Sequence, residues 1–320
     1  MRRAALGLIL ALTACAQPAA LPKGPVAAGP GIQVKAAAIP LDPANPKHVV
    51  LGAFTYAGGL NLTSGDTARL HGLSDLKITP DGQLTAESDE GDLLEARLVL
   101  DAAGHPAGLA QARMTVLDGP DGKPLQGKDE TDAEGVAVLP AGDRLVSFER
   151  HDRILVYPAT GGPPRLAPSP NVKFPYNLGM EALAAYPEAG PDAYLVGGEA
   201  SGQTWICRLS GGCVPDRKVP KPADWGLTAV APLPGGRIAY LLRAWDPLRG
   251  SRVAVTIWDA KGREIGRMAL ARPLTVDNFE GLAAVPGKDG LIRFYVISDD
   301  NFSSAQRTLL LAFDWRPPAN

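Results

Sequence analysis

Short apolar segments recur along the chain in one pattern: a small or acidic start, alternating apolar positions, and a closing proline. The five copies are SDLKITP (74–80), EGVAVLP (134–140), EALAAYP (181–187), GLTAVAP (226–232) and EGLAAVP (280–286). Their apolar anchors are 60, 47, 44 and 55 residues apart, at Leu76, Val136, Leu183, Leu227 and Leu282. A repeat of about 50 residues built from short β-type segments is typical of β-propellers.

Each copy is followed by a glycine-containing turn and two further β-type runs. The second runs are LTAESDE, LVSFER, AYLVGGE, IAYLLR and FYVISDD, and the third are LLEARLVL, ILVYP, WICRL, VAVTIW and TLLLAF. Their alternation of β-branched or aromatic residues with small or polar ones predicts half-buried strands. The segment HVVLGAFTYAGGLNL (48–62) predicts further strands that would close a ring against LLLAFDW near the C-terminus. We therefore expect an all-β propeller with five countable blades.

The first 15 residues, MRRAALGLILALTAC, have the pattern of an export signal. Arg2 and Arg3 precede an apolar run that ends at Ala14 and is shorter than the roughly 20 residues of a membrane span. The final Leu-Thr-Ala-Cys15 resembles a bacterial lipobox, which predicts lipidation of Cys15; an ordinary secretory signal is the alternative. Several acyl chains on Cys15 would anchor the protein to a lipid membrane, since stable anchorage takes about two chains.

A tether is predicted between this anchor and the folded domain. Residues 16–46 are rich in Ala, Pro and Gly, which favours a flexible linker, and residues 47–320 remain as the domain. Ala16 is not the aspartate associated with inner-membrane retention. We therefore expect the outer membrane, with the domain facing the periplasm.

Charge limits the partners. Without Arg2 and Arg3 the chain has 30 basic and 34 acidic residues and no basic run, which argues against nucleic acid. The sequence also contains no G-x-S-x-G elbow, no H-E-x-x-H pair and no dinucleotide glycine loop. Serine-esterase, zinc-protease and nucleotide chemistry are therefore unsupported.

Two cysteines lie close together in WICRLSGGCVPD. A hairpin centred on Ser210 would place Cys207 opposite Cys213, within disulfide range. Export to an oxidising compartment favours that bridge. A metal pair is the less favoured alternative, because no histidine accompanies the cysteines.

The acidic residues fall at two places in each copy. The first strand starts where the antiparallel second strand ends, so carboxylates at both places should meet at one mouth of the central channel. The groups are Asp75 with Asp89 and Glu90, Glu134 with Glu149, Glu181 with Glu199, and Glu280 with Asp299 and Asp300. The fourth copy differs, with Gly226 and Arg243 at these places.

Like charges crowded in this way repel one another unless a cation lies among them, and three interpretations stay open. A hard ion such as calcium takes six to eight oxygen ligands from such a cluster. Basic side chains could instead pair with the acids or hold an anionic substrate. Those candidates are Arg150, His151, Arg153, Lys173 and Arg243. In the third interpretation the acids only cap backbone N–H groups.

The same stretches resemble the phytase-like family, labelled "esterase-like activity of phytase". The resemblance rests on residues 58–109, DAEGVAVLPAGDRLVSFERHDRILVYP (132–158), NLGMEALAAYP (177–187) and DNFEGLAAVP with FYVISDDNF (277–302). It covers about residues 47–315. It implies six blades, calcium and a phosphate-ester substrate.

Two main hypotheses for function follow. In the first, the domain is a calcium-dependent phosphoric monoester hydrolase. Its calcium ligands would be Asp75, Asp89, Glu134, Glu149, Glu181, Glu199, Glu280 and Asp299. In the second, the same face of a non-catalytic propeller binds a partner of the cell envelope. A lactonase-type hydrolase with one channel calcium is a third possibility, which needs no basic cluster.

Overall fold

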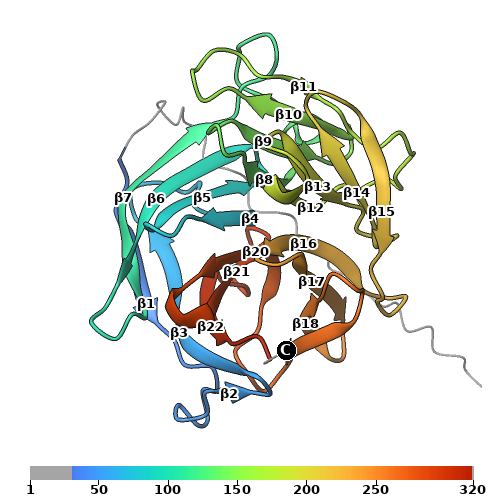
Figure 1. The fold of residues 1–320 in the computed structure, drawn as a ribbon. Helices are drawn as coiled ribbons and strands as arrows, with labels where there is room; N and C mark the ends of the chain where they lie inside the picture. The colour runs from blue at the N-terminus through green and yellow to red at the C-terminus, as the bar shows by residue number, and fades with distance from the viewer. Residues whose placement is uncertain (1–30, 319–320) are drawn as a thin grey trace, which may run out of the picture.

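The computed structural model describes residues 31–318. Cys15, the predicted signal peptide (1–15) and residues 16–30 of the predicted tether lie outside the described residues. Five β-sheets stand in a ring around a central axis (Figure 1). The predicted all-β propeller is therefore confirmed.

Four blades are four-stranded antiparallel sheets that follow the chain from the centre outward (Figure 1). Blade 1 contains β4 (Leu73–Ile78), β5 (Gln83–Ser88), β6 (Asp92–Leu100) and β7 (Pro106–Val116). Blade 2 contains β8 (Ala133–Val138), β9 (Arg144–Phe148), β10 (Arg153–Tyr157) and β11 (Arg165–Ala167). Blade 3 contains β12 (Ala182–Ala185), β13 (Ala193–Gly197), β14 (Gln203–Arg208) and β15 (Cys213–Lys218). Blade 4 contains β16 (Gly226–Leu233), β17 (Arg237–Asp246), β18 (Gly250–Trp258) and β19 (Glu264–Leu270).

Blade 5 joins the two ends of the domain and closes the ring. Its inner strands are β20 (Asn278–Pro286), β21 (Ile292–Asp299) and β22 (Leu309–Trp315). Its outer strands come from the start of the domain: β3 (Phe54–Ser64), β1 (Val34–Ala38) and the short β2 (Val50–Leu51). β3 pairs with β22, as the sequence predicted. The six blades implied by the family resemblance are not found in residues 31–318, because β3 completes the fifth blade instead of starting another.

The predicted domain boundary at residue 47 is also too late. β1 pairs with β3 from Val34 to Ala38, and Leu41 is buried in the core between blades 4 and 5. The alanines of β1 were interpreted as linker, yet they suit an edge strand packed against its neighbour. The folded domain therefore includes residues 31–46.

The core consists of five apolar clusters, one at each blade interface. One face of β13 packs on blade 2 through Tyr194 and Val196, and the other packs on blade 4 through Leu195. Every residue of β13 is therefore buried, so this second strand is buried on both faces and not on one as predicted. The third strands β6 and β14 keep partly buried positions between buried ones, as predicted. Burial of a large aliphatic side chain stabilises a fold by roughly 1.5–3 kcal/mol, so these interfaces hold the ring together.

Elements other than strands are short. The single turn of helix α1 (Lys128–Thr131) precedes β8, and two 3₁₀ turns, η1 (Pro187–Ala189) and η2 (Lys288–Gly290), lie in hairpins. None of the helices within residues 31–318 has the length and hydrophobicity to cross a membrane.

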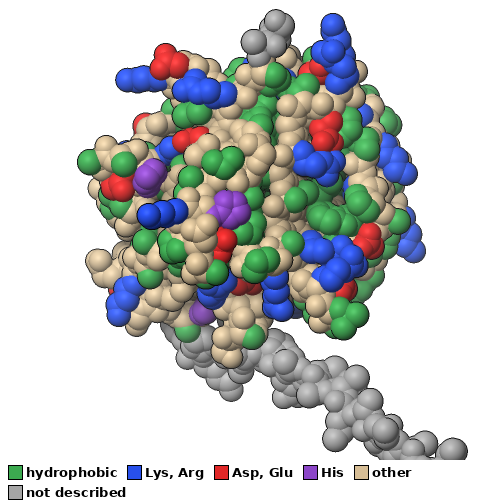
Figure 2. All heavy atoms as spheres, turned by 90° about the horizontal axis from the view of Figure 1, so that it is seen from below, with side chains coloured by type: hydrophobic (Ala, Val, Ile, Leu, Met, Phe, Trp, Pro, Cys, Tyr) green, Lys and Arg blue, Asp and Glu red, His purple; other side chains and the backbone are tan. Residues whose placement is uncertain are grey.

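Acidic and basic side chains are interspersed over the face seen in Figure 2.

The predicted disulfide is present. Cys207 of β14 and Cys213 of β15 are directly paired residues of one hairpin and are bridged. The turn between them contains Ser210, as expected.

Candidate metal site at the channel mouth

The repeated Glu-Gly pair has a structural cause at the start of two innermost strands. Glu134 of β8 and Glu280 of β20 each occupy a β-bulge, where the pairing register shifts. A bulge turns one side chain out of the normal alternation and is common beside active sites. The following residue, Gly281, packs against the backbone of Asp75 in β4, where an added Cβ would lie 2.7 Å from the Asp75 Cα. Gly135 makes the same close approach to blade 3. Glycine lets the inner strands meet, and the bulge aims the acid at the mouth.

Five carboxylates from blades 2 and 3 form what we call the acidic mouth. They are Asp132, Glu134, Glu149, Glu181 and Glu199. In two overlapping groups of three, with Glu149 shared, the nearest oxygens all lie within 4.8 Å of one another. Four of the five are buried and Glu134 is half-buried. The structure thus brings together four predicted ligands and adds Asp132.

Burial and mutual repulsion make these carboxyl groups hard to ionise. Burial, followed by repulsion from Glu181, raises the pKa of Glu134 well above its usual range. Burial, followed by repulsion from Glu199, does the same for Glu181. For Glu149 the pKa rises to about 7, mainly by burial, although the Gly179 N–H donates to this carboxylate and opposes the rise. A bound cation would relieve both causes.

Blade 4, which lacks the repeated acids, supplies a cation to its neighbours. Arg243 of β17 is paired with Gly226 at the start of β16. It contacts Glu280 Oε1 at 2.9 Å and Glu199 Oε1 at 3.4 Å, and lies 3.8 Å from Glu181 Oε1. Burial disfavours the charged guanidinium, but these carboxylates outweigh it and raise the pKa of Arg243. Gly226 leaves room for Glu199, since a Cβ there would lie 2.8 Å from the Glu199 Cγ. The departure of the fourth copy from the acidic pattern thus has a structural reason.

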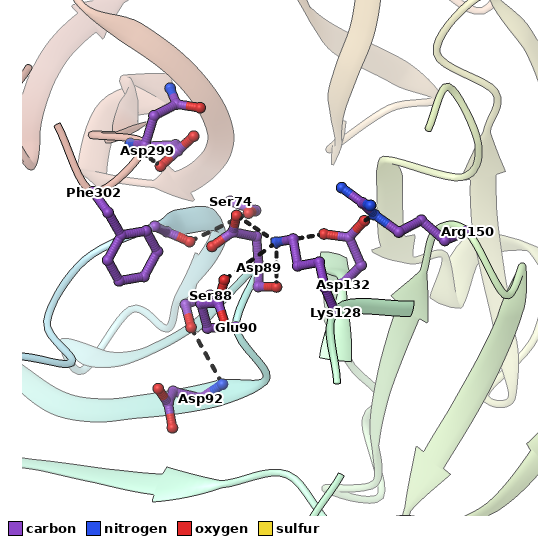
Figure 3. Close-up of polar contacts among 12 residues, drawn as sticks. Ser74, Ser88, Asp89, Glu90, Asp92, Lys128, Asp132, Arg150, Asp299 and Phe302 are labelled. Carbon is purple, nitrogen blue, oxygen red and sulfur yellow. Dashed lines mark hydrogen bonds and ion pairs between the residues drawn. The ribbon is translucent and has the colours of Figure 1, made fainter. Parts of the chain in front are cut away.

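A second internal cation lies between blades 1 and 2. The Lys128 amine of α1 is inserted between Asp89 and Asp132, 2.6 Å from an oxygen of each (Figure 3). Arg150 reaches Asp132 from the other side at 2.5 Å (Figure 3). Burial raises the pKa of Asp89 to about 6 in spite of Lys128. Asp89 is therefore joined to the acidic mouth through Lys128 and Asp132.

Asp75 was predicted as a ligand, but the structure occupies both of its oxygens. Oδ1 accepts from the N–H groups of Leu76 (2.8 Å) and Leu282 (3.2 Å). Oδ2 accepts from the Val136 N–H (3.1 Å) and from the Lys77 amine. Asp75 is fully buried and ties the inner strands of blades 1, 2 and 5 together. These contacts give it a structural role in place of the predicted ligand role.

Two predicted ligands belong to blade 5 and are held by an asparagine. Asn278 donates through Nδ2 to Glu280 (2.9 Å) and Asp299 (3.2 Å), while its Oδ1 accepts from Arg243 (2.7 Å). Burial raises the pKa of Glu280 to about 7, and burial with repulsion from Glu280 raises the pKa of Asp299. The pair is thus linked to the acidic mouth through Arg243.

Most of the basic residues predicted to bind substrate are paired with acids. Arg150 bonds Asp132, Arg153 contacts Glu130 Oε2 at 3.1 Å, and His151 contacts Glu130 Oε1 at 2.9 Å. The Arg153 guanidinium also stacks 4.3 Å from the Phe148 ring centroid. Arg243 lies among the three glutamates described above. Lys173 is exposed. These contacts make charge pairing, one of the open interpretations, the role of Arg150, Arg153 and Arg243.

Comparison with known protein families gives one match that covers most of the chain. The family model "Phytase-like: Esterase-like activity of phytase" matches residues 68–302. The chain belongs to the phytase-like family. Comparison with curated protein sequences found no match.

Solved structures similar to this phytase-like chain are propellers of low sequence identity. A protein provisionally described as a gluconolactonase has 15% identity and a TM-score of 0.50, with coverage of 91% of this chain and 96% of that one. This likeness shows the fold alone. A calcium-binding regucalcin from Agrobacterium tumefaciens has 14% identity and a TM-score of 0.45, covering 92% and 93% of the two chains. Virginiamycin B lyase from Staphylococcus aureus has 11% identity and a TM-score of 0.44, covering 88% and 99%.

Sequence reasoning missed a histidine–aspartate pair at the edge of the mouth. His71 Nδ1 lies 2.6 Å from Asp300 Oδ2, and this bond is the main cause that raises the pKa of His71. Asp300 is fixed by the N–H of Gly72 (3.1 Å) and the hydroxyl of Thr308 (2.9 Å). The two residues are 229 positions apart, and His71 stood among four scattered histidines, so no spacing joined them.

The other missed group is a buried acid behind the mouth. Glu87 of β5 is fully buried, and neither carboxylate oxygen has a hydrogen-bond partner. Burial, followed by repulsion from Asp75, raises its pKa well above the usual range. Glu87 lies inside the predicted run LTAESDE, whose last two residues, Asp89 and Glu90, drew the prediction instead.

The acidic mouth of this phytase-like propeller fits a hard divalent cation. All its donors are carboxylate oxygens, which suit calcium or magnesium better than softer metals. Glu181 is 6% exposed, and its Oε2 has no hydrogen-bond partner. Three basic groups reach the mouth, and two of them, Lys128 and Arg150, contact only Asp132 there. Neither Glu134 nor Glu149 forms an ion pair within residues 31–318, and both have raised pKa values, so a bound cation would favour their ionised forms.

Proposed function

We propose that this protein is an exported, lipid-anchored hydrolase of phosphoric monoesters that depends on a divalent cation, with calcium as the preferred ion. The observation that carries the proposal is the group Glu149, Glu181 and Glu199, which offer one oxygen each within 4.8 Å of one another. Within residues 31–318, Glu181 Oε2 also has no hydrogen-bond partner. Membership of the phytase-like family supports the choice of an ester substrate.

The residues of the acidic mouth and the neighbouring Arg243 would have different roles in the proposed hydrolysis. Glu149, Glu181 and Glu199 would hold the cation, which when bound polarises a phosphoryl oxygen and acidifies water. Arg243 fixes Glu199 and Glu280 in place and limits the negative charge of the site. Glu134 is half-buried, and within residues 31–318 no hydrogen bond reaches its side chain. The bulge aims this high-pKa carboxyl at the mouth, where it could take up or release a proton.

Cation binding is tested by thermal melting in chelator and in millimolar calcium, magnesium or manganese. Wild type should melt higher with the preferred ion, because an ion that binds only the folded state stabilises it. Glu181→Gln should lose most of this gain, while its metal-free melting temperature should stay equal or rise, since one repelling charge is removed. Glu188→Gln, on the exposed turn η1, is the matched control and should keep the full gain. A wild type that gains nothing from any divalent ion would remove the metal site.

The reaction class is tested with an aryl phosphate and, in parallel, a sugar lactone. Calcium-dependent release of phosphate that Glu181→Gln abolishes supports the proposal. Lactone opening without phosphate release would assign the site to a lactonase. Tight calcium binding with neither activity would favour the non-catalytic binding propeller.

Anchorage is tested by Cys15→Ser in fractionated cells. We expect the variant to be soluble or to accumulate as unprocessed precursor, because Cys15 would carry the acyl chains. Normal processing together with continued membrane association would contradict the lipobox interpretation.

A further inference from the structure

A cavity of about 950 Å³ opens between blades 4 and 5 beside the acidic mouth. Arg243 and Asn278 form its inner wall, and both also bind the carboxylates described above. Any ligand in this cavity would therefore lie next to Glu280 and the channel mouth. Glu199, Glu280 and Asp299 do not line the cavity, whereas Asp277 does.

Arg272 gives the cavity an uncompensated positive charge. Within residues 31–318 no hydrogen bond or ion pair reaches its guanidinium, although it is one of the lining residues. It lies over Gly250, where an added Cβ would be 3.2 Å from the Arg272 Cζ. The side chain is exposed and lies next to Gly250, so its charge can meet an incoming anion.

A second guanidinium in the cavity is only weakly engaged. Arg307 contacts Asp277 Oδ2 at 3.4 Å, which is long for a charge-assisted bond. Asp277 is meanwhile held by the N–H of Asn278 at 3.1 Å. Some N–H groups of the Arg307 guanidinium can therefore donate to a ligand with little loss of free energy from the contact with Asp277.

The cavity also exposes a large aromatic side chain. Trp245 lines it and is 64% exposed, which is unusual for the largest apolar side chain. Arg243 and Trp245 are two residues apart on β17, so both project from the same side of the strand. Leu274 and Val276 add apolar surface to the lining. A ligand here would meet cationic groups and a flat apolar face together.

We propose that this cavity binds a small ligand in which an oxyanion, phosphate or carboxylate, is joined to a ring that packs on Trp245. Arg272 and Arg307 bind the oxyanion. The identification of this ligand with the substrate rests on the proposed function. Binding of the anion itself does not depend on the proposed function.

Binding is tested by calorimetry on metal-free protein with phenyl phosphate, benzoate, phenol and inorganic phosphate. Phenyl phosphate or benzoate should bind more tightly than phenol or inorganic phosphate, and the better of the two identifies the oxyanion. Arg272→Ala should raise the Kd by about tenfold or more, since a charge-assisted contact is lost. Trp245→Ala should raise it by about two- to tenfold.

The controls separate this site from a general charge effect. Arg263→Ala removes an exposed arginine from the β18–β19 turn at the opposite face and should leave the Kd unchanged. Arg272 makes no ion pair or hydrogen bond within residues 31–318, so its variant should keep the wild-type melting temperature. Equal affinity of Arg272→Ala and wild type, or equal affinity for phenol and phenyl phosphate, would overturn the proposal.

Failure of this inference and failure of the proposed function give different results. If calcium binding and hydrolysis persist while Arg272→Ala leaves the KM unchanged, the cavity is not the substrate site. If anion binding depends on Arg272 but no divalent ion stabilises the protein, the cavity binds its ligand without the proposed hydrolase.

Discussion

Asp75 offers the sharpest test of the structural account, because the sequence made it a metal ligand and the structure makes it a link between blades. We consider the change Asp75→Asn, which keeps the shape and removes the charge. One oxygen of the amide can still accept from Leu76 and Leu282. The amide nitrogen would then face two donors, the N–H of Val136 and the amine of Lys77.

The cost follows from these contacts. A buried donor left without its acceptor costs about 1–3 kcal/mol, and breaking a buried ion pair costs about 3–5 kcal/mol. Two gains oppose this loss: the buried charge disappears, and so does its repulsion of Glu87. We expect a net loss of about 2–4 kcal/mol from a total stability of about 5–15 kcal/mol. For a domain of this size, that lowers the melting temperature by roughly 5–15 °C.

The assay is thermal and urea unfolding followed by circular dichroism, in chelator and in calcium. Glu134→Gln is the matched control, because it neutralises an acid one blade away that accepts no hydrogen bond within residues 31–318. Asp75→Asn should lose stability equally in both conditions, whereas Glu134→Gln should be neutral or stabilising without metal. An Asp75→Asn protein of normal metal-free stability that loses only its response to calcium would refute the structural role.

Three further predictions concern pH and the disulfide. Glu149 and Glu280 have folded-state pKa values of about 7, above their unfolded values, so metal-free protein should lose stability as the pH rises from about 4.5 to 7. Calcium should flatten this slope, and melting curves across that range, with and without the ion, check it. The raised pKa of His71 contributes stability below its ordinary value near 6.5, which is lost as the pH rises through the folded value; His71→Gln should lack this step in a pH series of urea midpoints. Cys207→Ser with Cys213→Ser should destabilise the domain by about 2 kcal/mol, since a seven-residue loop is no longer closed, and two free thiols in unfolded, non-reduced wild type would contradict the bridge.

Local sequence determined the strands and their order. Each blade repeats the same elements: a first strand that ends in proline, a turn, and second and third strands. They recur because each blade packs against its two neighbours in the same way. The Cys207–Cys213 hairpin was equally local, since its turn and its spacing suffice to oppose two cysteines. The fourth strand of each blade and β1 were not predicted. Edge strands contain fewer apolar residues than inner strands, so their sequences resemble loops or linkers.

The site was predictable in part, for a geometric reason. Antiparallel pairing brings the start of one strand to the end of the next, so Glu134 with Glu149 and Glu181 with Glu199 could be paired from sequence alone. Which acids are neutralised internally could not be predicted. Arg243 serves the acids of blades 3 and 5, and Lys128 joins Asp89 to Asp132; these partners are set by how blades pack around the ring.

The sequence by itself determined that this chain folds as a β-propeller and that acidic residues lie at one mouth of its channel. Both follow from strand periodicity and from the position of a residue within its own strand, which are local properties. Only the tertiary structure decided that the ring closes with the five countable blades and not with the six that the resemblance implied, and that Asp75 turns inward to hold three strands. It also decided that Glu134, Glu149 and Glu181 crowd together with raised pKa values. Those outcomes depend on contacts between residues as far apart as Asp75 and Leu282. The free energy of a buried carboxylate is fixed by such neighbours and not by its place in the chain.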